Sequence, residues 1–174
     1  VKAFVGGLAP KLDPSLPLFY AQHAHPQNTC YGSRAWGAWD DKGAATAALS
    51  PYPNAVAFSG HSHYSLTDER SLWQGAFTSI GTSSLSYTGM PYGRENGTSE
   101  NRKLLLHMPR MVTNTGKQGM LLSVFGDRMV IERHEFVFDE SLGPDWVLPI
   151  PCGGEKDMPF TVVKREAQAV APEF

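Results

Sequence analysis

The chain has 174 residues, which is the size of one domain. Hydrophobic residues make up 41% of it and charged residues 18%, so the chain can bury a core and does not have the composition of a disordered protein. Its formal charge is −2 with no long run of either sign, which argues against a nucleic-acid partner, and no apolar stretch approaches the roughly 20 residues that a membrane-spanning helix needs.

The first regular element expected from the sequence is a short strand. Residues 1–16 contain Gly6-Gly7 and two prolines, which favours a loop or the tail of a helix. Residues 16–22 (LPLFYAQ) form an apolar and aromatic run, which is typical of a strand buried on both faces. The run ends in His23-Ala24-His25-Pro26, because proline cannot continue a central strand.

A helix and a second strand are expected next. Residues 27–40 are rich in Gly and Trp, which indicates a loop. Asp40 is placed to cap a helix over residues 41–49, where alanine dominates. After a turn with two prolines, residues 54–59 (NAVAFS) predict another short buried strand that leads directly into Gly60-His61-Ser62-His63.

The second half of the chain is expected to be mostly β-structure. Strands are expected within residues 71–87, followed by an exposed loop over residues 88–101. Gly126-Asp127 is a hairpin signal between two later strands. The later strands are expected at residues 103–107, 119–125, 129–138 and 145–149.

This order of elements predicts the fold class and the domain organisation. A strand, a helix, a strand and then a run of strands predict an α+β or α/β sandwich. We expect the early strands to be central and the later strands to form an antiparallel sheet. One domain over residues 1–152 and a polar tail over residues 153–174 are expected. Cys30 and Cys152 lack metal-ligand spacing, and a disulfide between them stays open because geometry decides it.

Histidines at the ends of the two buried strands are the strongest functional signal. Two His-x-His pairs, His23/His25 and His61/His63, each follow a predicted strand. In open α/β sheets, ligands bind just beyond the carboxyl ends of the strands. If the two strands are neighbours, His23 and the 61/63 pair come together, and neutral imidazoles are good ligands for transition metals.

The turn at Gly60-His61-Ser62-His63 is predicted to present two metal ligands. Gly60 is expected to let the backbone turn sharply, so that His61 and His63 reach two adjacent metals, one each. An isolated His-x-His pair is a weak signal, and the combination of both strand ends strengthens it. Packing or solvent exposure is the expectation for His25, and a surface or hydrogen-bonded position is expected for His107 and His134.

These motifs resemble those of the calcineurin-like metallophosphoesterases. Phe58-Ser59-Gly60-His61-Ser62-His63 is similar to the GHxH signature of that family. Residues 19–26 are similar to its preceding motif, in which a strand ends in a metal-ligand histidine that is closely followed by proline. The resemblance covers about residues 15–150.

The resemblance implies a fold, a metal centre and an activity. The family has an α/β sandwich and a dinuclear centre of two divalent transition metals, here Zn, Mn, Fe or Ni, that hydrolyses phosphate esters. His23 and His61 would bind one metal and His63 the other, with no catalytic residue assigned. Candidate substrate-binding residues lie in the loop that follows the first strand and are Asn28, Tyr31, Arg34 and Trp36.

The family's early motifs, which supply acidic and further ligands, do not occur in this sequence. We therefore expect the chain to be the C-terminal portion of a metallophosphoesterase, with the missing ligands on an N-terminal half or on another chain. The strand within residues 16–22 would then have an open edge, and a homodimer could form through it. The aromatic, Lys-poor composition resembles that of exported bacterial phosphatases, which points to an exported or periplasmic location.

Two other functional classes stay open from the sequence. The first is an inactive binding or structural module that keeps the fold without metal chemistry, which the missing acidic motifs favour. The second is a metal-independent hydrolase that uses Ser59 and a histidine, although the chain has no G-x-S-x-G elbow.

Overall fold

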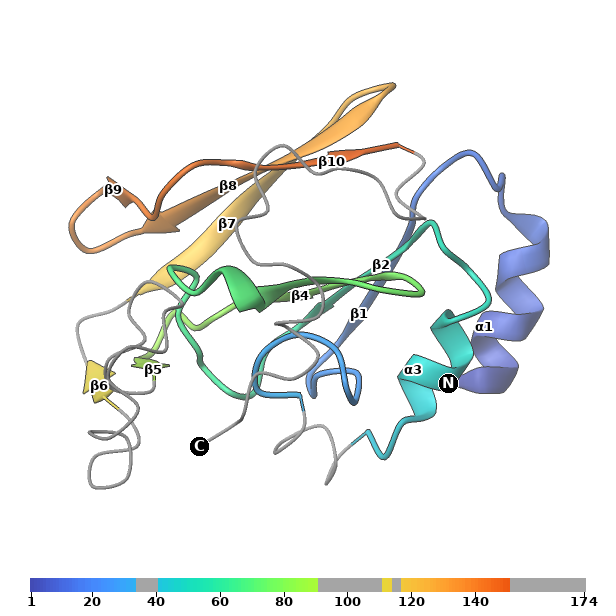
Figure 1. Ribbon diagram of the computed structural model, residues 1–174, viewed down its shortest axis with the longest axis horizontal. Helices are drawn as coiled ribbons and strands as arrows, with labels where there is room; N and C mark the ends of the chain where they lie inside the picture. The colour runs from blue at the N-terminus through green and yellow to red at the C-terminus, as the bar shows by residue number, and fades with distance from the viewer. Residues whose placement is uncertain (34–40, 91–110, 114–116, 151–174) are drawn as a thin grey trace.

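Three layers make up the part of the chain that the structure describes. The structure is a computed structural model that describes residues 1–33, 41–90, 111–113 and 117–150. Helices α1 (Lys2–Leu8) and α3 (Ala44–Leu49) cover one face of a four-stranded sheet, and a second sheet covers the other face (Figure 1). The expected mixture of helices and sheets is therefore confirmed, with strands predominant in the second half.

The first sheet contains both strands that lead into the histidine pairs. Its order is β1-β2-β4-β3, where β1 and β2 span Leu18–Gln22 and Ala55–Ser59, and β3 and β4 span Leu72–Gln74 and Thr78–Gly81. β1 and β4 both run parallel to β2, so the carboxyl ends of these three strands meet at one edge of the sheet. β3 is antiparallel to β4.

β2 is a central strand as expected, whereas the expectation for β1 is wrong. Four of the five β2 residues are buried, which agrees with the apolar run that predicted this strand. β1 forms an edge of the sheet, and its residues alternate between half-buried and exposed. Phe19 on its exposed face is 46% accessible. An apolar run predicted burial on both faces, but no described strand pairs with the outer edge of β1.

The helical layer differs from the expectation in two places, at helix α1 and at the start of helix α3. Residues 2–8 form helix α1 and Ala9–Lys11 form a short 3-10 helix, although glycine and proline favoured a loop. Burial of Val5 against the cluster of α3 and β2 outweighs the weak helix propensity of Gly6-Gly7. In the first turn of α3 (Ala44–Leu49), the Ala45 amide donates a hydrogen bond to Asp41 Oδ1.

The second sheet is antiparallel, as the sequence predicts. It has the order β10-β8-β7, with the short β9 (Glu140–Ser141) paired to β8. β7 and β8 form the hairpin that Gly126-Asp127 predicted, since Val124 lies opposite Met129 across the turn. The three main strands are β7 (Gln118–Val124), β8 (Arg128–Glu135) and β10 (Trp146–Pro149).

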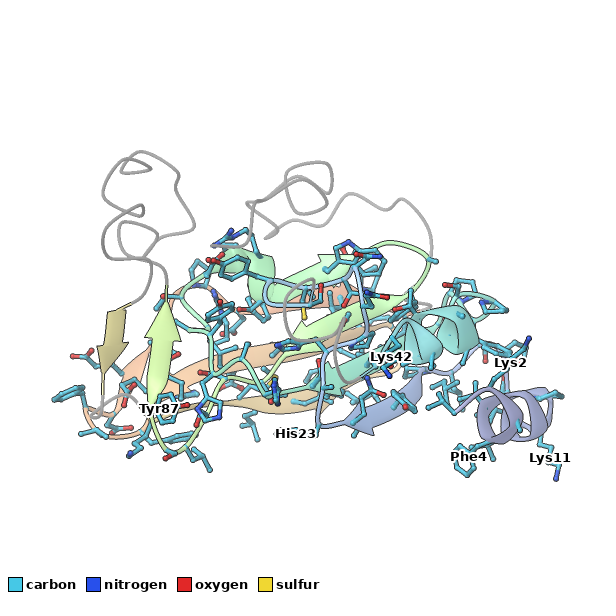
Figure 2. All side chains as sticks on the ribbon, turned by 90° about the horizontal axis from the view of Figure 1, so that it is seen from below. Lys2, Phe4, Lys11, His23, Lys42 and Tyr87 are labelled. Carbon is cyan, nitrogen blue, oxygen red and sulfur yellow. The ribbon has the colours of Figure 1, made fainter. Side chains whose placement is uncertain are left out.

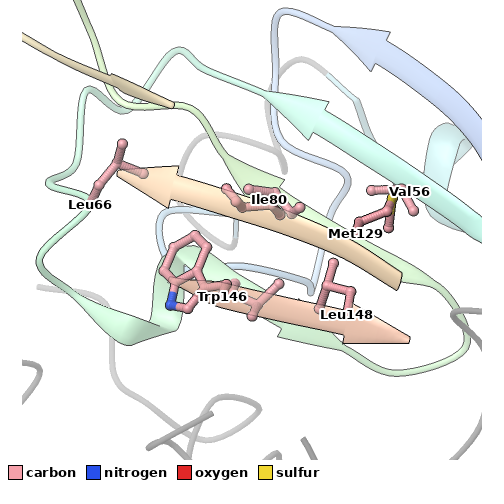
Figure 3. Close-up of a cluster of buried hydrophobic side chains, with 8 residues drawn as sticks. Val56, Leu66, Ile80, Met129, Trp146 and Leu148 are labelled. Carbon is pink, nitrogen blue, oxygen red and sulfur yellow. The ribbon is translucent and has the colours of Figure 1, made fainter. Parts of the chain in front are cut away.

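The main core lies between the two sheets. Alternate residues of β8 are buried, which is the pattern of a strand with one face against the core. Figure 3 shows the apolar side chains of this core between the strands of the two sheets. They come from both sheets and from the loop after the histidine turn, and they are Val56, Leu66, Leu72, Ile80, Met129, Ile131, Trp146 and Leu148.

Several expected features lie outside the described residues. Asp40, the strand at residues 103–107, His107, most of the loop at residues 88–101 and the tail from residue 153 belong to this group. Residues 88–90 form strand β5 (Thr88–Met90), which pairs with β6 (Met111–Thr113). Cys30 is a free, buried thiol, and Cys152 is not described. No described helix is long and apolar enough to cross a membrane.

Two leucines of the second sheet test where the core lies. Leu148 on β10 is fully buried, whereas Leu121 on β7 is 57% exposed. We expect Leu148→Ala to lower the free energy of unfolding by about 2–5 kcal/mol, because it leaves a cavity in the core. Leu121→Ala makes the same chemical change and should cost about 0.5 kcal/mol or less. Urea unfolding of both variants measures the difference, and equal losses would contradict the placement of the core.

Candidate metal centre

The parallel pairing of β1 and β2 brings the two histidine motifs together. Gln22 lies opposite Ser59 at the ends of the two strands, and the Gly60 amide continues the pairing by donating to the His23 carbonyl at 2.9 Å. His23 Nε2 then lies 3.0 Å from His61 Nδ1, with the rings edge to face. The predicted proximity of His23 and His61 is therefore present in the structure.

An open pocket lies at this edge of the sheet. Its volume is about 490 Å³, which is within the range of small-molecule sites. The three histidines predicted as metal ligands, His23, His61 and His63, all line it. Thr82 and Ser83 close another side, because they follow β4 at the same end of the sheet. The pocket is thus built from the carboxyl ends of three neighbouring parallel strands.

The histidines themselves make the turn after β2. His61 and His63 both have left-handed backbone conformations, with φ values of 72° and 57°. Such conformations are uncommon for residues other than glycine and concentrate at functional sites. Gly60, which was expected to supply the unusual conformation, is not among the residues with positive φ. A Cβ atom added at Gly60 would meet only ordinary contacts, at 3.6 Å or more.

His63 is oriented by the segment after β4. Its Nδ1 lies 3.2 Å from the Tyr87 carbonyl oxygen, and its ring lies 4.3 Å from the Tyr87 ring. A carbonyl oxygen only accepts, so Nδ1 donates and Nε2 of the neutral ring keeps a free lone pair. Metal-binding histidines commonly have this arrangement. Figure 2 shows Tyr87 on the same side of the molecule as His23.

The distance between His23 and His61 fits two ligands of one metal. Nitrogens bound to one zinc at the usual ~2.0–2.1 Å lie roughly 3.3 Å apart in a tetrahedral site. The observed 3.0 Å between Nε2 and Nδ1 is close to this value, and it equally fits a hydrogen bond in which one ring donates to the other. Within the described ranges, no group of three or more His, Cys, Asp or Glu side chains converges on one point. The described residues therefore bring two facing imidazoles together at this point, without a third ligand-type side chain.

His25, the fourth histidine of the two pairs, lies beneath the turn rather than in solvent. It is 1% exposed, and its Nδ1 and Nε2 lie 2.8 Å from Ser59 Oγ and 2.7 Å from Ser62 Oγ. Burial, together with the neighbouring His61 and His23, lowers the pKa of His25 to about 4. The ring is therefore neutral at neutral pH. The packed position that the sequence allowed for this residue is observed.

The loop that follows the histidine turn is anchored by two buried arginines. Arg70 forms an ion pair with Asp68, and both side chains are 2% exposed. Arg133 of β8 donates to the Leu66 carbonyl at 2.8 Å and contacts Glu69 at 3.1 Å. Buried charges are stable when they are paired and hydrogen-bonded, so these contacts restrain the loop that carries the chain away from the pocket.

Of the candidate substrate-binding residues, the two that the structure describes, Asn28 and Tyr31, do not line the pocket. Tyr31 is 5% exposed and stacks on Tyr64, with the Arg70 guanidinium 3.5 Å above its ring, so it belongs to the core. Asn28 is exposed in the turn after His25, with a left-handed φ of 61°. Arg34 and Trp36 lie outside the described residues.

The sequence did not reveal Thr82 and Ser83, which line the pocket, or Tyr87, which contacts His63. Thr82 and Ser83 follow a buried strand, which is the same signal that identified the histidines. The signal identifies Thr82 and Ser83 only once β4 is known to pair with β2, because that pairing brings the end of β4 to the pocket. Tyr87 has no such pattern, since it reaches His63 from an exposed segment.

Comparisons with protein-family models, with curated proteins and with solved structures gave no match.

Alanine substitutions at Gly32 and Gly60 test which of these two glycines the histidine turn requires. Gly32 has a φ of 93°, and a Cβ atom there would lie 2.9 Å from the Ser62 Cβ atom. We expect Gly32→Ala to lower the free energy of unfolding by about 1–3 kcal/mol, because it adds backbone strain and a clash. Gly60→Ala should change it by less than about 1 kcal/mol. Thermal unfolding compares the two, and a larger loss for Gly60→Ala would contradict this view of the turn.

Proposed function

We propose that the chain carries the histidine half of a dinuclear centre in a metal-dependent phosphoesterase of the calcineurin-like class. His23 and His61 bind one divalent transition metal, and His63 binds the second. The observation that carries the proposal is the meeting of His23 and His61 at the carboxyl ends of two adjacent parallel strands, with nitrogens 3.0 Å apart. The left-handed conformations of His61 and His63 support it, because they place both imidazoles at one pocket.

The ring nitrogens decide how each histidine acts. His63 donates through Nδ1 to the Tyr87 carbonyl and so offers Nε2 to a metal. His61 offers Nδ1 and His23 offers Nε2, the two atoms that face each other. Imidazole suits Zn, Fe and Ni, whereas Mn prefers oxygen ligands, and the three histidines alone do not decide among these four metals. When bound, such a centre supplies Lewis-acid stabilisation and an activated water for the hydrolysis of a phosphate ester.

Further ligands of this centre come from a protein segment outside the 174 residues, which is either an N-terminal half of the domain or another chain. The outer edge of β1 supports this part of the proposal. β1 ends at Gln22, directly before His23, and its Phe19 is 46% exposed. A strand added in parallel at this edge would end beside His23, where a carboxylate could reach the pocket. The same edge could pair two copies of the chain.

A binding or structural module without metal chemistry is the alternative. One observation favours it: His23 and His61 can satisfy each other through a hydrogen bond, so the pair is stable without a metal. A serine hydrolase is disfavoured, because Ser59 is only 2% exposed and its hydroxyl is therefore closed to a substrate, although it is bonded to His25. A measurement of metal uptake distinguishes the binding or structural module, which needs no metal, from the metal-dependent phosphoesterase.

Substitution of the three histidines tests the proposal. We expect the purified chain to take up zinc or manganese, and His61→Ala to abolish most of that uptake, because it removes a ligand from the His23 pair. His63→Ala should remove uptake at the second metal only. Elemental analysis and calorimetric titration measure metal content and affinity.

His134→Ala is the matched control for these variants. His134 lies on β8 with 35% of its side chain exposed and its Nε2 3.6 Å from Glu132, and it does not line the pocket. Its substitution should leave metal uptake unchanged. If uptake by the chain is unaffected by His61→Ala and His63→Ala together, the ligand assignment is wrong.

A further inference from the structure

His25 joins the two strands beneath the histidine turn. It lies two residues beyond His23 in sequence and is 1% exposed. One ring nitrogen bonds Ser59, the last residue of β2, and the other bonds Ser62, which lies between His61 and His63. One imidazole therefore connects the end of β2 to the centre of the turn.

The surroundings hold this imidazole in one place. Cys30 Sγ lies 3.4 Å from its Nδ1, and a Cβ atom at Gly81, the last residue of β4, would lie 3.5 Å from its Cε1 atom. The thiol is protonated and unreactive, because burial raises the pKa of Cys30 to about 11. The ring has no room to leave its position without displacing the end of β4 or the loop after β1.

Ser62 is the point at which this restraint acts on the turn. It is 3% exposed, its amide bonds the Gly60 carbonyl at 2.9 Å, and its Oγ accepts from the Tyr64 amide at 3.3 Å. His61 and His63 on either side have left-handed backbones. Residues held in such sparsely populated conformations need surroundings that determine them, and His25 supplies a side-chain contact to the residue between them.

We propose that His25 is a positioning residue, which fixes Ser59 and Ser62 and thereby holds His61 and His63 in the conformation that presents their imidazoles to the pocket. The inference rests on the proposed metal site, since it assigns to His25 a role in forming that site. A neutral imidazole donates through one nitrogen and accepts through the other, so one serine accepts while the other donates. No aliphatic side chain can replace both contacts.

Four variants separate the contacts of His25 from its volume. His25→Leu removes both hydrogen bonds. His25→Gln can place an amide group near the position of Nε2 and so keep the contact with Ser62, while His25→Asn can do the same for Nδ1 and Ser59. Ser62→Ala removes the contact between Ser62 Oγ and His25, together with the longer hydrogen bond from the Tyr64 amide, and leaves His25 in place. His134→Leu makes the same exchange as His25→Leu at a half-exposed histidine away from the pocket.

Cobalt titration of the 174-residue chain is the first measurement. The visible absorption of Co²⁺ reports both affinity and coordination geometry. We expect His25→Leu to weaken Co²⁺ binding by about 10–100-fold, the usual effect of losing a residue that orients metal ligands. His25→Gln should recover part of this loss, and His134→Leu should bind like the unaltered chain. If His25 only filled space, the amide of His25→Gln would not restore Co²⁺ affinity, so a partial recovery indicates a role for the hydrogen bonds.

A second measurement does not depend on metal. In the metal-free chain, the His23 and His61 rings are close enough to give a nuclear Overhauser effect between them. We expect this signal to be lost or strongly reduced in His25→Leu and in Ser62→Ala, and to remain in His134→Leu. The comparison decides the inference even if the unaltered chain binds no Co²⁺, a result that would overturn the proposed function instead.

Retention of the ring-to-ring signal together with unaltered Co²⁺ affinity in a folded His25→Leu variant would overturn the positioning role. If His25→Leu does not fold, as judged by circular dichroism, Ser62→Ala decides the question, because it removes only one hydroxyl from a packed site. An unchanged signal and an unchanged affinity in folded Ser62→Ala would then be the contrary result.

Discussion

The parallel pairing of β1 with β2 is the constraint on which the candidate site depends. The pairing sets Gln22 beside Ser59, and one further hydrogen bond, from Gly60 to the His23 carbonyl, carries it into the histidine motifs. A shift of the register by one residue would move each side chain to the opposite face of the sheet. Three features follow from this one alignment. They are the contact between His23 and His61, the lining of the pocket by the residues after β4, and the hydrogen bonds of His25 to Ser59 and Ser62.

The core of the protein holds this alignment from both sides of the sheet. Neighbouring residues of β2 face opposite ways, since Val56 joins the core between the sheets and Ala57 joins the cluster beneath the helices. The loop beyond the turn is tied to the second sheet by Arg133, which bonds the Leu66 carbonyl and stacks on Trp146. The pocket therefore lies on a restrained part of the molecule, although its histidines have uncommon backbone conformations.

Several elements could be predicted because their patterns are local. The β2 strand, the Gly126-Asp127 hairpin and the antiparallel second sheet follow from apolar runs and turn residues. Helix α1 and the edge position of β1 could not be predicted in this way. Tertiary contacts at Val5 outweigh the local preference of Gly6-Gly7, and an apolar run does not reveal whether a strand has one neighbour or two.

The sequence by itself determined which residue types gather at the candidate site, because both His-x-His pairs stand directly after apolar strands. Only the tertiary structure decided the role of each histidine. His23 and His61 face one another, His63 turns to the Tyr87 carbonyl, and His25 is buried between two serines. The reason is physical: side-chain direction depends on backbone angles and on partners far away in the chain, and neither is encoded in the spacing of a motif.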